Sequence, residues 1–488
     1  MKKWIVILLL VKCFDVSGNN SVLRLNLRES VELAQTQSPD ILFARHNFRA
    51  SYWSYIHYRA NFLPSLTFNS TPNFNRMITP IVQPDGTVEF AQQNLLLSDA
   101  TFMVNQNIPL TGGTLFVGSG LQRLDLFHNN TQQYRSTPLI VGYRQELLGF
   151  NALRWERRIE PLRFEEAKRR YVENLELVGA RAVRMFFDLA KAQTNLEIAQ
   201  TNYANADTLY VFARGRYNIG TITENEMLQL RINKLMEEGR RLEAQMQLDD
   251  AMENLRAFLA IRETLPIEVE VESRIPLAHI EVSRALEYAA ENAVDMLTMQ
   301  RRQIESEGNV AHAQAIARLR VDLFMQFGLA QMGQTIEAAY RNPLDQQFVE
   351  LGIRLPILDW GRGRGQVEVA RSNRDMIHAQ VAQQKIDFEM NIVRLVNQFN
   401  LQSHQLNVAA QVNDTAERRS EVARRLFLLG KSSILDLNAS ITERDAALRN
   451  YINTLHTYWS LYYMLRSITL FDFVQNIPIT EDYRLLVR

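Results

Sequence analysis

The fold of this chain is decided by residues 175–213, which read LELVGARAVRMFFDLAKAQTNLEIAQTNYANADTLYVFA. Apolar and small residues recur there at alternating spacings of three and four, at Leu175, Val178, Ala182, Met185, Leu189, Ala192, Leu196, Ala199, Tyr203, Ala206, Tyr210 and Ala213. This heptad pattern is typical of helices that supercoil around one another along an apolar stripe. The sequence therefore predicts a long helix that needs partner helices.

The chain contains this stretch twice. Residues 142–258 align without a gap on residues 352–468, and a shorter match relates 25–40 to 280–295. In the second copy the stripe is interrupted by Gln402 and Asn413, polar residues of the kind that set register in coiled coils. Repetition on this scale indicates a quasi-symmetric architecture. The expected parts are a first repeat at 19–262, a second repeat at 263–473 and a C-terminal tail at 474–488.

Each copy of the stripe ends at a glycine, Gly220 or Gly430, before a helical pattern resumes. Glycine adopts φ > 0 at little cost and often terminates helices. Each repeat is therefore expected to hold an antiparallel helical hairpin. We place one at about 152–262 with its tip at 220, and the other at about 362–472 with its tip at 430.

Segments with the period of a β-strand precede both hairpins, at about 63–147 and about 321–357. Apolar residues alternate with polar or small ones in strands of about ten residues, for example at Val321, Leu323, Met325, Phe327 and Leu329. Strands with one apolar and one polar face suit a soluble sandwich or a transmembrane barrel. The barrel is favoured because long helical rods offer no packing partner for the apolar face.

The first repeat has more strand material than the second, at 63–75, 101–110, 114–127 and 138–147. A turn-rich segment at 80–86, which contains Pro80, Pro84 and Gly86, is expected to form an exposed loop. The sequence leaves open whether the additional hairpin joins a barrel or projects from it.

The N-terminus has the pattern of a secretory signal peptide at 1–18. Lys2 and Lys3 precede a short apolar run that ends at Val11, and Val16-Ser17-Gly18 resembles a cleavage site. The alternative, a membrane anchor, needs about 20 apolar residues. The only cysteine, Cys13, follows Lys12 within this leader, which argues against lipidation and leaves the mature chain without disulfides.

Composition and motifs exclude several classes of function. The 54 acidic and 54 basic residues cancel, so no basic surplus points to a nucleic-acid partner. The eight histidines are scattered without a His-Glu-x-x-His motif, and we expect no metal site, no cofactor and no enzymatic activity. Glycines at 361, 363 and 365 lack the phosphate-loop pattern, and we expect a flexible strand-to-helix junction there.

An ordered set of short motifs covers nearly all of the mature sequence. It comprises Leu25-Asn26-Leu27 with Pro39-Asp40, Leu63-Pro64-Ser65-Leu66, Leu355-Pro356-Ile357-Leu358-Asp359-Trp360-Gly361-Arg362, and the tips Arg216-Tyr217-Asn218-Ile219-Gly220 and Phe427-Leu428-Leu429-Gly430. In this order the motifs resemble the TolC-like outer-membrane efflux proteins, the outer membrane factor family.

The resemblance implies an α+β membrane protein that forms a homotrimer. Each subunit would lend strands to one outer-membrane β-barrel and helical hairpins to one α-helical barrel that crosses the periplasm of a Gram-negative-type cell. It also implies outer-membrane lipid, a periplasmic adaptor (membrane fusion) protein and an inner-membrane transporter as partners, and no nucleic acid.

In that family acidic residues six positions after each tip glycine form a gate at the periplasmic end, which here implies Glu226 and Asp436. Further acidic residues of some relatives are replaced by Gln229 and Ala439. The alternative is that both carboxylates are solvated helix residues favoured by the helix dipole. The adaptor would dock on the tips, at Tyr217, Ile219, Gly220, Thr221, Phe427, Leu429, Gly430 and Lys431. Alternatively, the apolar residues among these cap the core of their own hairpin.

The function that follows is a passive exit duct, the outer-membrane channel of a tripartite efflux or secretion system. A periplasmic coiled-coil scaffold would explain the heptad stripes but not the two-faced strands. A secreted enzyme would need a catalytic constellation that the sequence does not show.

Overall fold

The computed structural model describes residues 22–128, 130–263, 265–272, 279–429, 431–432 and 434–487. The expected signal peptide at 1–18 lies outside this part of the chain. The chain divides into two compact units: one from Met1–His46, Arg170–Ala293 and Met390–Asp482, the other from Asn47–Arg169, Val294–Glu389 and Tyr483–Arg488. Below, the first is called the helical unit and the second the sheet unit.

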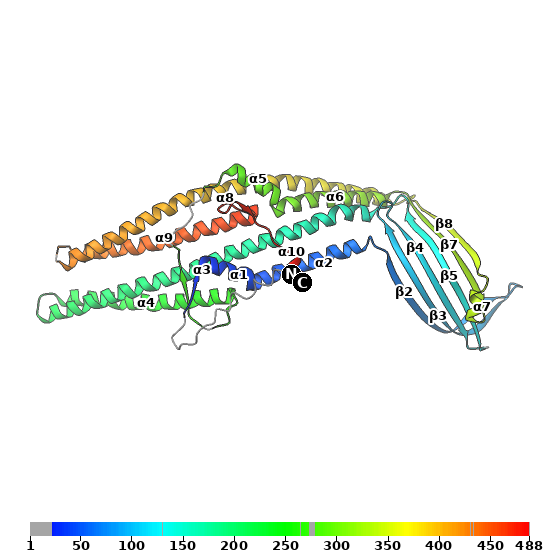
Figure 1. The fold of residues 1–488 in the computed structure, drawn as a ribbon, viewed down its shortest axis with the longest axis horizontal. Coiled ribbons are helices and arrows are strands. Elements are labelled where there is room, and N and C mark those ends of the chain that lie inside the picture. The colour runs from blue at the N-terminus through cyan, green and yellow to red at the C-terminus, as the bar shows by residue number, and fades with distance from the viewer. Residues whose placement is uncertain are drawn as a thin grey trace, which may run out of the picture. The chain divides into compact units, whose positions relative to one another are not determined.

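Four long helices form two hairpins (Figure 1). The helices are α3 (Ala152–Asn218), α4 (Glu224–Phe258), α8 (Arg362–Leu428) and α9 (Ile434–Thr469). Helices α3 and α8 are both 67 residues long, and their first and last residues are related by the 210-residue offset of the sequence repeat. The duplication seen in the sequence is therefore a duplication of structure. No helix in the described ranges combines the length and apolar character that a membrane span requires.

The shorter repeat is duplicated as well. Helices α1 (Leu27–Gln37) and α5 (Val282–Asn292) are both 11 residues long and are offset by 255 residues. Helix α1 begins with a capping box in which Asn26 and Glu29 satisfy each other's backbone N–H groups. Strand β1 (Leu23–Asn26) directly precedes α1, whereas β6 (Ile267–Glu270) ends well before α5 begins. The two strands pair in parallel.

In the helical unit the heptad stripe of α3 is buried or half-buried at each predicted position, as expected for a packing seam. Leu196 and Ala199 of α3 pack with Ala244 of α4, and the side chain of Asn202 donates to Asp445 of α9 (3.1 Å). Gln402 of α8, one of the predicted polar interruptions, donates from its side chain to the backbone oxygen of Thr454 on α9 (3.0 Å). These contacts order the helices as α4, α3, α9, α8.

The sheet unit holds one antiparallel sheet with the strand order β2-β3-β4-β5-β7-β8 (Figure 1). Its strands are β2 (Ser65–Val82), β3 (Val88–Ile108), β4 (Gly113–Leu126), β5 (Thr131–Glu146), β7 (Arg320–Gly333) and β8 (Leu344–Arg354). Helix α2 (Pro39–Ala60) leads into β2 and α6 (Val294–Ala317) leads into β7. The sheet unit also contains α7 (Ile336–Tyr340) and α10 (Tyr483–Leu486). The short strands β9 (Phe471–Asp472) and β10 (Ile477–Pro478) belong to the helical unit.

The register of the sheet separates its side chains into two faces. One row of opposed residues crosses five strands as Leu66, Val104, Val117, Val141 and Phe327. The adjacent row, one residue further along each strand and on the other face, is Ser65, Asn105, Phe116, Gly142 and Gln326. From β2 to β7 the sheet therefore has one apolar face and one mixed, more polar face, as the strand period predicted, whereas in β8 Gln347 lies opposite Phe327.

Two expectations from the sequence were wrong in detail. Strand β2 continues through the first three residues of the predicted loop at 80–86, because residues 76–82 pair with residues 88–94, and the turn is confined to residues 83–87. The glycines at 363 and 365 lie in α8 rather than in a flexible junction. The carboxylate of Asp359 accepts the backbone N–H groups of Gly361 (3.0 Å) and Gly363 (2.8 Å), and it thereby caps the helix.

Candidate functional site at the helix tips

The tip of the first hairpin is a tight turn built around Gly220. Helix α3 ends at Asn218, and Gly220 has φ of +73°, the left-handed conformation predicted for the tip glycine. The N–H of Thr221 donates to the carbonyl oxygen of Arg216 (2.9 Å), and the N–H of Gly220 donates to that of Tyr217 (2.9 Å). The last carbonyls of α3 are thus satisfied within the turn.

The second tip repeats this closure. The N–H of Lys431 donates to the carbonyl oxygen of Leu426 (2.9 Å), a bond related to the Thr221–Arg216 bond by the 210-residue offset. Gly430 and the side chain of Phe427 lie outside the described part of the chain. The two tips lie at the same end of the helical unit (Figure 1).

The predicted docking residues are exposed wherever the structure describes them. Ile219 is 74% and Leu429 is 67% exposed, although both are apolar. Tyr217 is 39% exposed, and Thr221 and Lys431 are also on the surface. The two apolar side chains therefore do not cap the core of their own hairpin, which was the alternative interpretation.

Glu226 is the third residue of α4 and belongs to a capping box. Its carboxylate accepts the backbone N–H of Thr223 (2.8 Å) and the hydroxyl of Thr223 (3.0 Å), while its own N–H donates to the Thr223 hydroxyl (3.3 Å). These hydrogen bonds lower the pKa of Glu226. The side chain is exposed, so its negative charge is held in a fixed place on the surface of the tip.

Asp436 occupies the equivalent third position of α9. The hydroxyl of Ser432 donates to its Oδ2 atom at 3.5 Å, and the residue is exposed. Both predicted gate carboxylates therefore lie in the first turn of a helix that leaves a tip. Within one chain they belong to separate helices.

The capping role of Glu226 was missed in the sequence, although the signal was present. Thr223-Glu224-Asn225-Glu226 has the Thr-x-x-Glu spacing of a capping box directly after the turn. The same residue is thus suited both to ordering the start of α4 and to presenting a charge.

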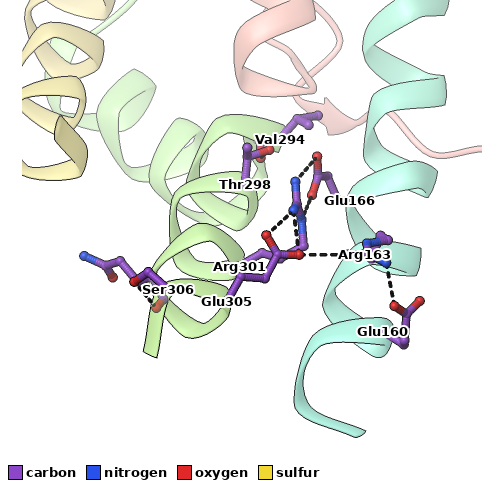
Figure 2. Close-up of polar contacts among 9 residues, drawn as sticks. Glu160, Arg163, Glu166, Val294, Thr298, Arg301, Glu305 and Ser306 are labelled. Carbon is purple, nitrogen blue, oxygen red and sulfur yellow. Dashed lines mark hydrogen bonds and ion pairs between the residues drawn. The ribbon is translucent and has the colours of Figure 1, made fainter. Parts of the chain in front are cut away.

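A second polar cluster, in the sheet unit, was also missed. Arg301 of α6 donates to Glu166 of α3 (2.6 Å) and to Glu305 (2.9 Å), and Arg163 donates to Glu305 (2.8 Å) and Glu160 (2.6 Å) (Figure 2). Hydrogen bonding to Glu166 raises the pKa of Arg301. Glu166 is buried, so the cluster fixes α6 against α3 just before α6 leads into strand β7.

Two comparisons with known proteins bear on this arrangement. A family model described as Outer membrane efflux protein matches residues 91–260 and 285–458. The chain belongs to the outer membrane efflux protein family. The two matched segments cover most of both structural repeats, including both hairpin tips and the residues Glu226 and Asp436.

Solved outer-membrane channels share the fold. The CmeC channel of Campylobacter jejuni is 15% identical, with a TM-score of 0.64 over 94% of this chain and 88% of that chain. VceC of Vibrio cholerae is 16% identical, with a TM-score of 0.62 over 91% and 95%. The MtrE channel of Neisseria gonorrhoeae is 14% identical, with a TM-score of 0.51 over 93% and 90%. Comparison with curated protein sequences gives no significant match.

The efflux protein is accordingly an outer-membrane channel that extends into the periplasm. It is a transport component and not an enzyme. In the described residues no three His, Cys, Asp or Glu side chains are grouped as metal ligands would be.

Proposed function

We propose that this efflux protein is the passive exit duct of a tripartite efflux or secretion system, closed at its periplasmic helix tips. An inner-membrane transporter supplies the energy, and a periplasmic adaptor protein links it to the duct. The observation that carries the proposal is a pair of exposed apolar stripes on the helical unit. Further copies of the same chain would bury these stripes.

The first stripe is on α4 and the second on α8, the two helices at the ends of the order α4, α3, α9, α8. On α4 the stripe has heptad spacing and consists of Leu228, Ile232, Leu235, Leu242 and Met246, which are 41–60% exposed. On α8 it includes Leu401, Val408 and Val412, which are 49–59% exposed. Heptad stripes drive helix packing, so α4 of one chain pairs with α8 of the next and closes a homotrimeric helical barrel.

The sheet supplies the membrane part of the same trimer. Its apolar face, with Leu66, Val117 and Phe327 exposed, suits lipid, while its polar face suits a water-filled lumen. The scaffold alternative leaves this exposed apolar face without a partner. Joined around one axis, the sheets form a β-barrel in the outer membrane.

The tips supply the gate and the docking surface. Three chains bring three copies of Glu226 and three of Asp436 to one end of the tunnel, where a ring of carboxylates favours cations. The MtrE channel has been solved in an open state, and by analogy the tips of this duct open to pass cargo. Exposed Ile219 and Leu429 meet the adaptor.

The trimer is tested by substituting one stripe residue. Leu242→Asp places a charge in the proposed α4–α8 contact, and Gln247→Asp places the same charge at an exposed polar position of the same helix. We expect trimers for wild type and Gln247→Asp and monomers for Leu242→Asp, measured by light scattering in detergent. If Leu242→Asp forms trimers as stable as those of wild type, the proposed contact between α4 and α8 is wrong.

Docking is tested in cells that depend on the efflux system. Ile219→Asp with Leu429→Asp is expected to abolish export while leaving trimer formation and bilayer conductance unchanged, because both side chains are exposed in the single chain. Unchanged export would show that the adaptor binds elsewhere. Failure of purified wild-type protein to insert into planar bilayers would favour the scaffold.

A further inference from the structure

The two structural repeats differ by one β-hairpin. The first repeat contributes four strands, β2 to β5, and the second contributes only two, β7 and β8. All six form one continuous sheet, in which β3 pairs with β4 from Leu95–Leu126 to Ile108–Gly113. The additional hairpin is therefore attached along the edge of the sheet and is not held by a loop alone.

The hairpin of β2 and β3 has the same two faces as the rest of the sheet. In β2 the apolar residues Leu66, Phe68 and Phe74 lie on one face, and the polar residues Thr67 and Asn69 lie on the other. All five are exposed. Phe68 and Phe102 lie opposite each other on the apolar face, with ring centroids 4.7 Å apart. A hairpin that projected into water would expose these apolar side chains, so the alternation indicates contact with lipid.

Exposed leucines mark the ends of the strands nearest the helices. Leu63 before β2 is 65% exposed, Leu110 in the turn between β3 and β4 is 89% exposed, and Leu148 and Leu355 after β5 and β8 are more than half exposed. Exposed leucines thus lie at the same end of β2 and β3 as of β5 and β8. This continuity places the hairpin at the same membrane depth as the other strands.

The two edge strands of the sheet, β2 and β8, have the direction and the side-chain pattern needed to pair with each other between chains. In the described part of the chain β2 and β8 each pair on one side only. They are antiparallel, since successive strands of the sheet alternate in direction, and both carry apolar residues on the same face. Pro72 has no N–H to donate and is tolerated in an edge strand, so a neighbour is expected to pair with residues 65–71 of β2.

We propose that β2 and β3 are transmembrane strands and that β2 of one chain pairs with β8 of the next chain. The inference deepens the proposed function, because it rests on the trimeric barrel proposed above. Each chain then contributes its six-stranded sheet, and three chains close a barrel of 18 strands. The partner at this surface is a second copy of the same chain.

The test is a cysteine-accessibility scan of the full-length protein in outer-membrane vesicles, in a Cys13→Ser background. Leu66, Thr67, Phe68 and Asn69 of β2 are replaced singly by cysteine and treated with a small charged methanethiosulfonate. We expect positions 67 and 69 to react at least about tenfold faster than 66 and 68, because only one face of a barrel strand meets water. Similar rates at all four positions would show that the hairpin projects into water.

Strand β8 provides the reference. Glu350 and Leu351 lie on opposite faces, so Glu350→Cys should react fast and Leu351→Cys slowly if the sheet spans the membrane. Alternation in β8 without alternation in β2 overturns the present inference and keeps the channel. Absence of alternation in both strands overturns the proposed function itself.

The contact between chains is tested by oxidative cross-linking. Pairs that combine Thr67→Cys or Asn69→Cys with Gln346→Cys or Glu350→Cys are expected to yield covalent dimers and trimers. If the hairpin lay outside the wall, β8 would instead meet β4, and pairs that combine Thr114→Cys or Gln122→Cys with the same β8 positions would cross-link. Cross-links from β4 and none from β2 would contradict the proposal.

Discussion

Arg466 of α9 and Glu176 of α3 form a bidentate ion pair inside the helical unit. Nε of Arg466 donates to Oε2 of Glu176 (2.7 Å) and Nη2 donates to Oε1 (2.9 Å), while Nη1 donates to Asp472 (2.9 Å). Glu176 and Asp472 are only 2–3% exposed. Burial raises the pKa of Glu176, and the charge of Arg466 opposes that rise. The two repeats are thus joined by a charged contact that links residues 290 positions apart.

Removing the positive charge of Arg466 should strongly destabilise the helical unit. Arg466→Met leaves two buried carboxylates without a positive partner, and we expect it to destabilise the helical unit by about 3–5 kcal/mol. The control is Arg418→Met, because the Arg418–Asp414 pair on α8 is largely exposed and is expected to contribute less than about 1 kcal/mol. Guanidinium unfolding in detergent measures both. Equal shifts of the two midpoints would mean that the buried pair does not hold the repeats together.

Stability should also depend on pH through His456 of α9. Burial first, and then the charge of Lys191, lower the pKa of His456, whose Nδ1 lies 2.8 Å from Nζ of Lys191. The unfolded chain takes up a proton near pH 6.5 while the folded chain resists it, so this contribution to stability is complete above about pH 6.5 and falls as the pH drops below that value.

The measurement is the unfolding midpoint between pH 8 and pH 5. His456→Gln should flatten the decline below about pH 6.5, since its side chain does not titrate. His404→Gln, at an exposed position of α8, is the control and should keep the wild-type slope. A wild-type slope in His456→Gln would assign the pH dependence to other groups.

The repeat offers a matched pair of glycines in the sheet. A Cβ at Gly142 would overlap the Phe116 ring and lie 2.6 Å from the carbonyl oxygen of Met325, whereas at the equivalent Gly352 the nearest atom would be 3.7 Å away. Gly142→Ala should therefore destabilise the sheet by about 1–3 kcal/mol and reduce the amount of folded protein in the outer membrane. Gly352→Ala should have little effect. Normal assembly of Gly142→Ala would show that Phe116 and β7 yield easily.

The helices could be predicted from sequence because their signal is long and repeated. The stripe from Leu175 to Ala213 covers many turns, and the offset of 210 residues relates the bounds of α3 to those of α8. Helix α2 escaped prediction beyond its first residues. Its 22 residues place aromatic and polar side chains on all sides, so no single apolar stripe marks it.

The strand ends and the charged contacts could not be predicted in the same way. Residues 76–82 and 88–94 carry one proline, Pro80, and several polar side chains, and they become strands because they pair with each other. The pairing of Arg466 with Glu176 has no sequence signal, since Ile386 stands where the second repeat would need a glutamate. At the site, the resemblance to the efflux family located Glu226 and Asp436 by their distance from the tip glycines, and the role of each charge stays a prediction.

Single-channel conductance in planar bilayers shows whether the charges at the tips gate the channel. Glu226→Gln with Asp436→Asn removes the charges while Gln at 226 can still complete the capping box; Thr223→Ala weakens the cap and keeps the charge. We predict small cation-selective currents blocked by divalent cations in wild type and in Thr223→Ala, and loss of selectivity and block in the double variant. Currents in the double variant identical to wild type would contradict the gate.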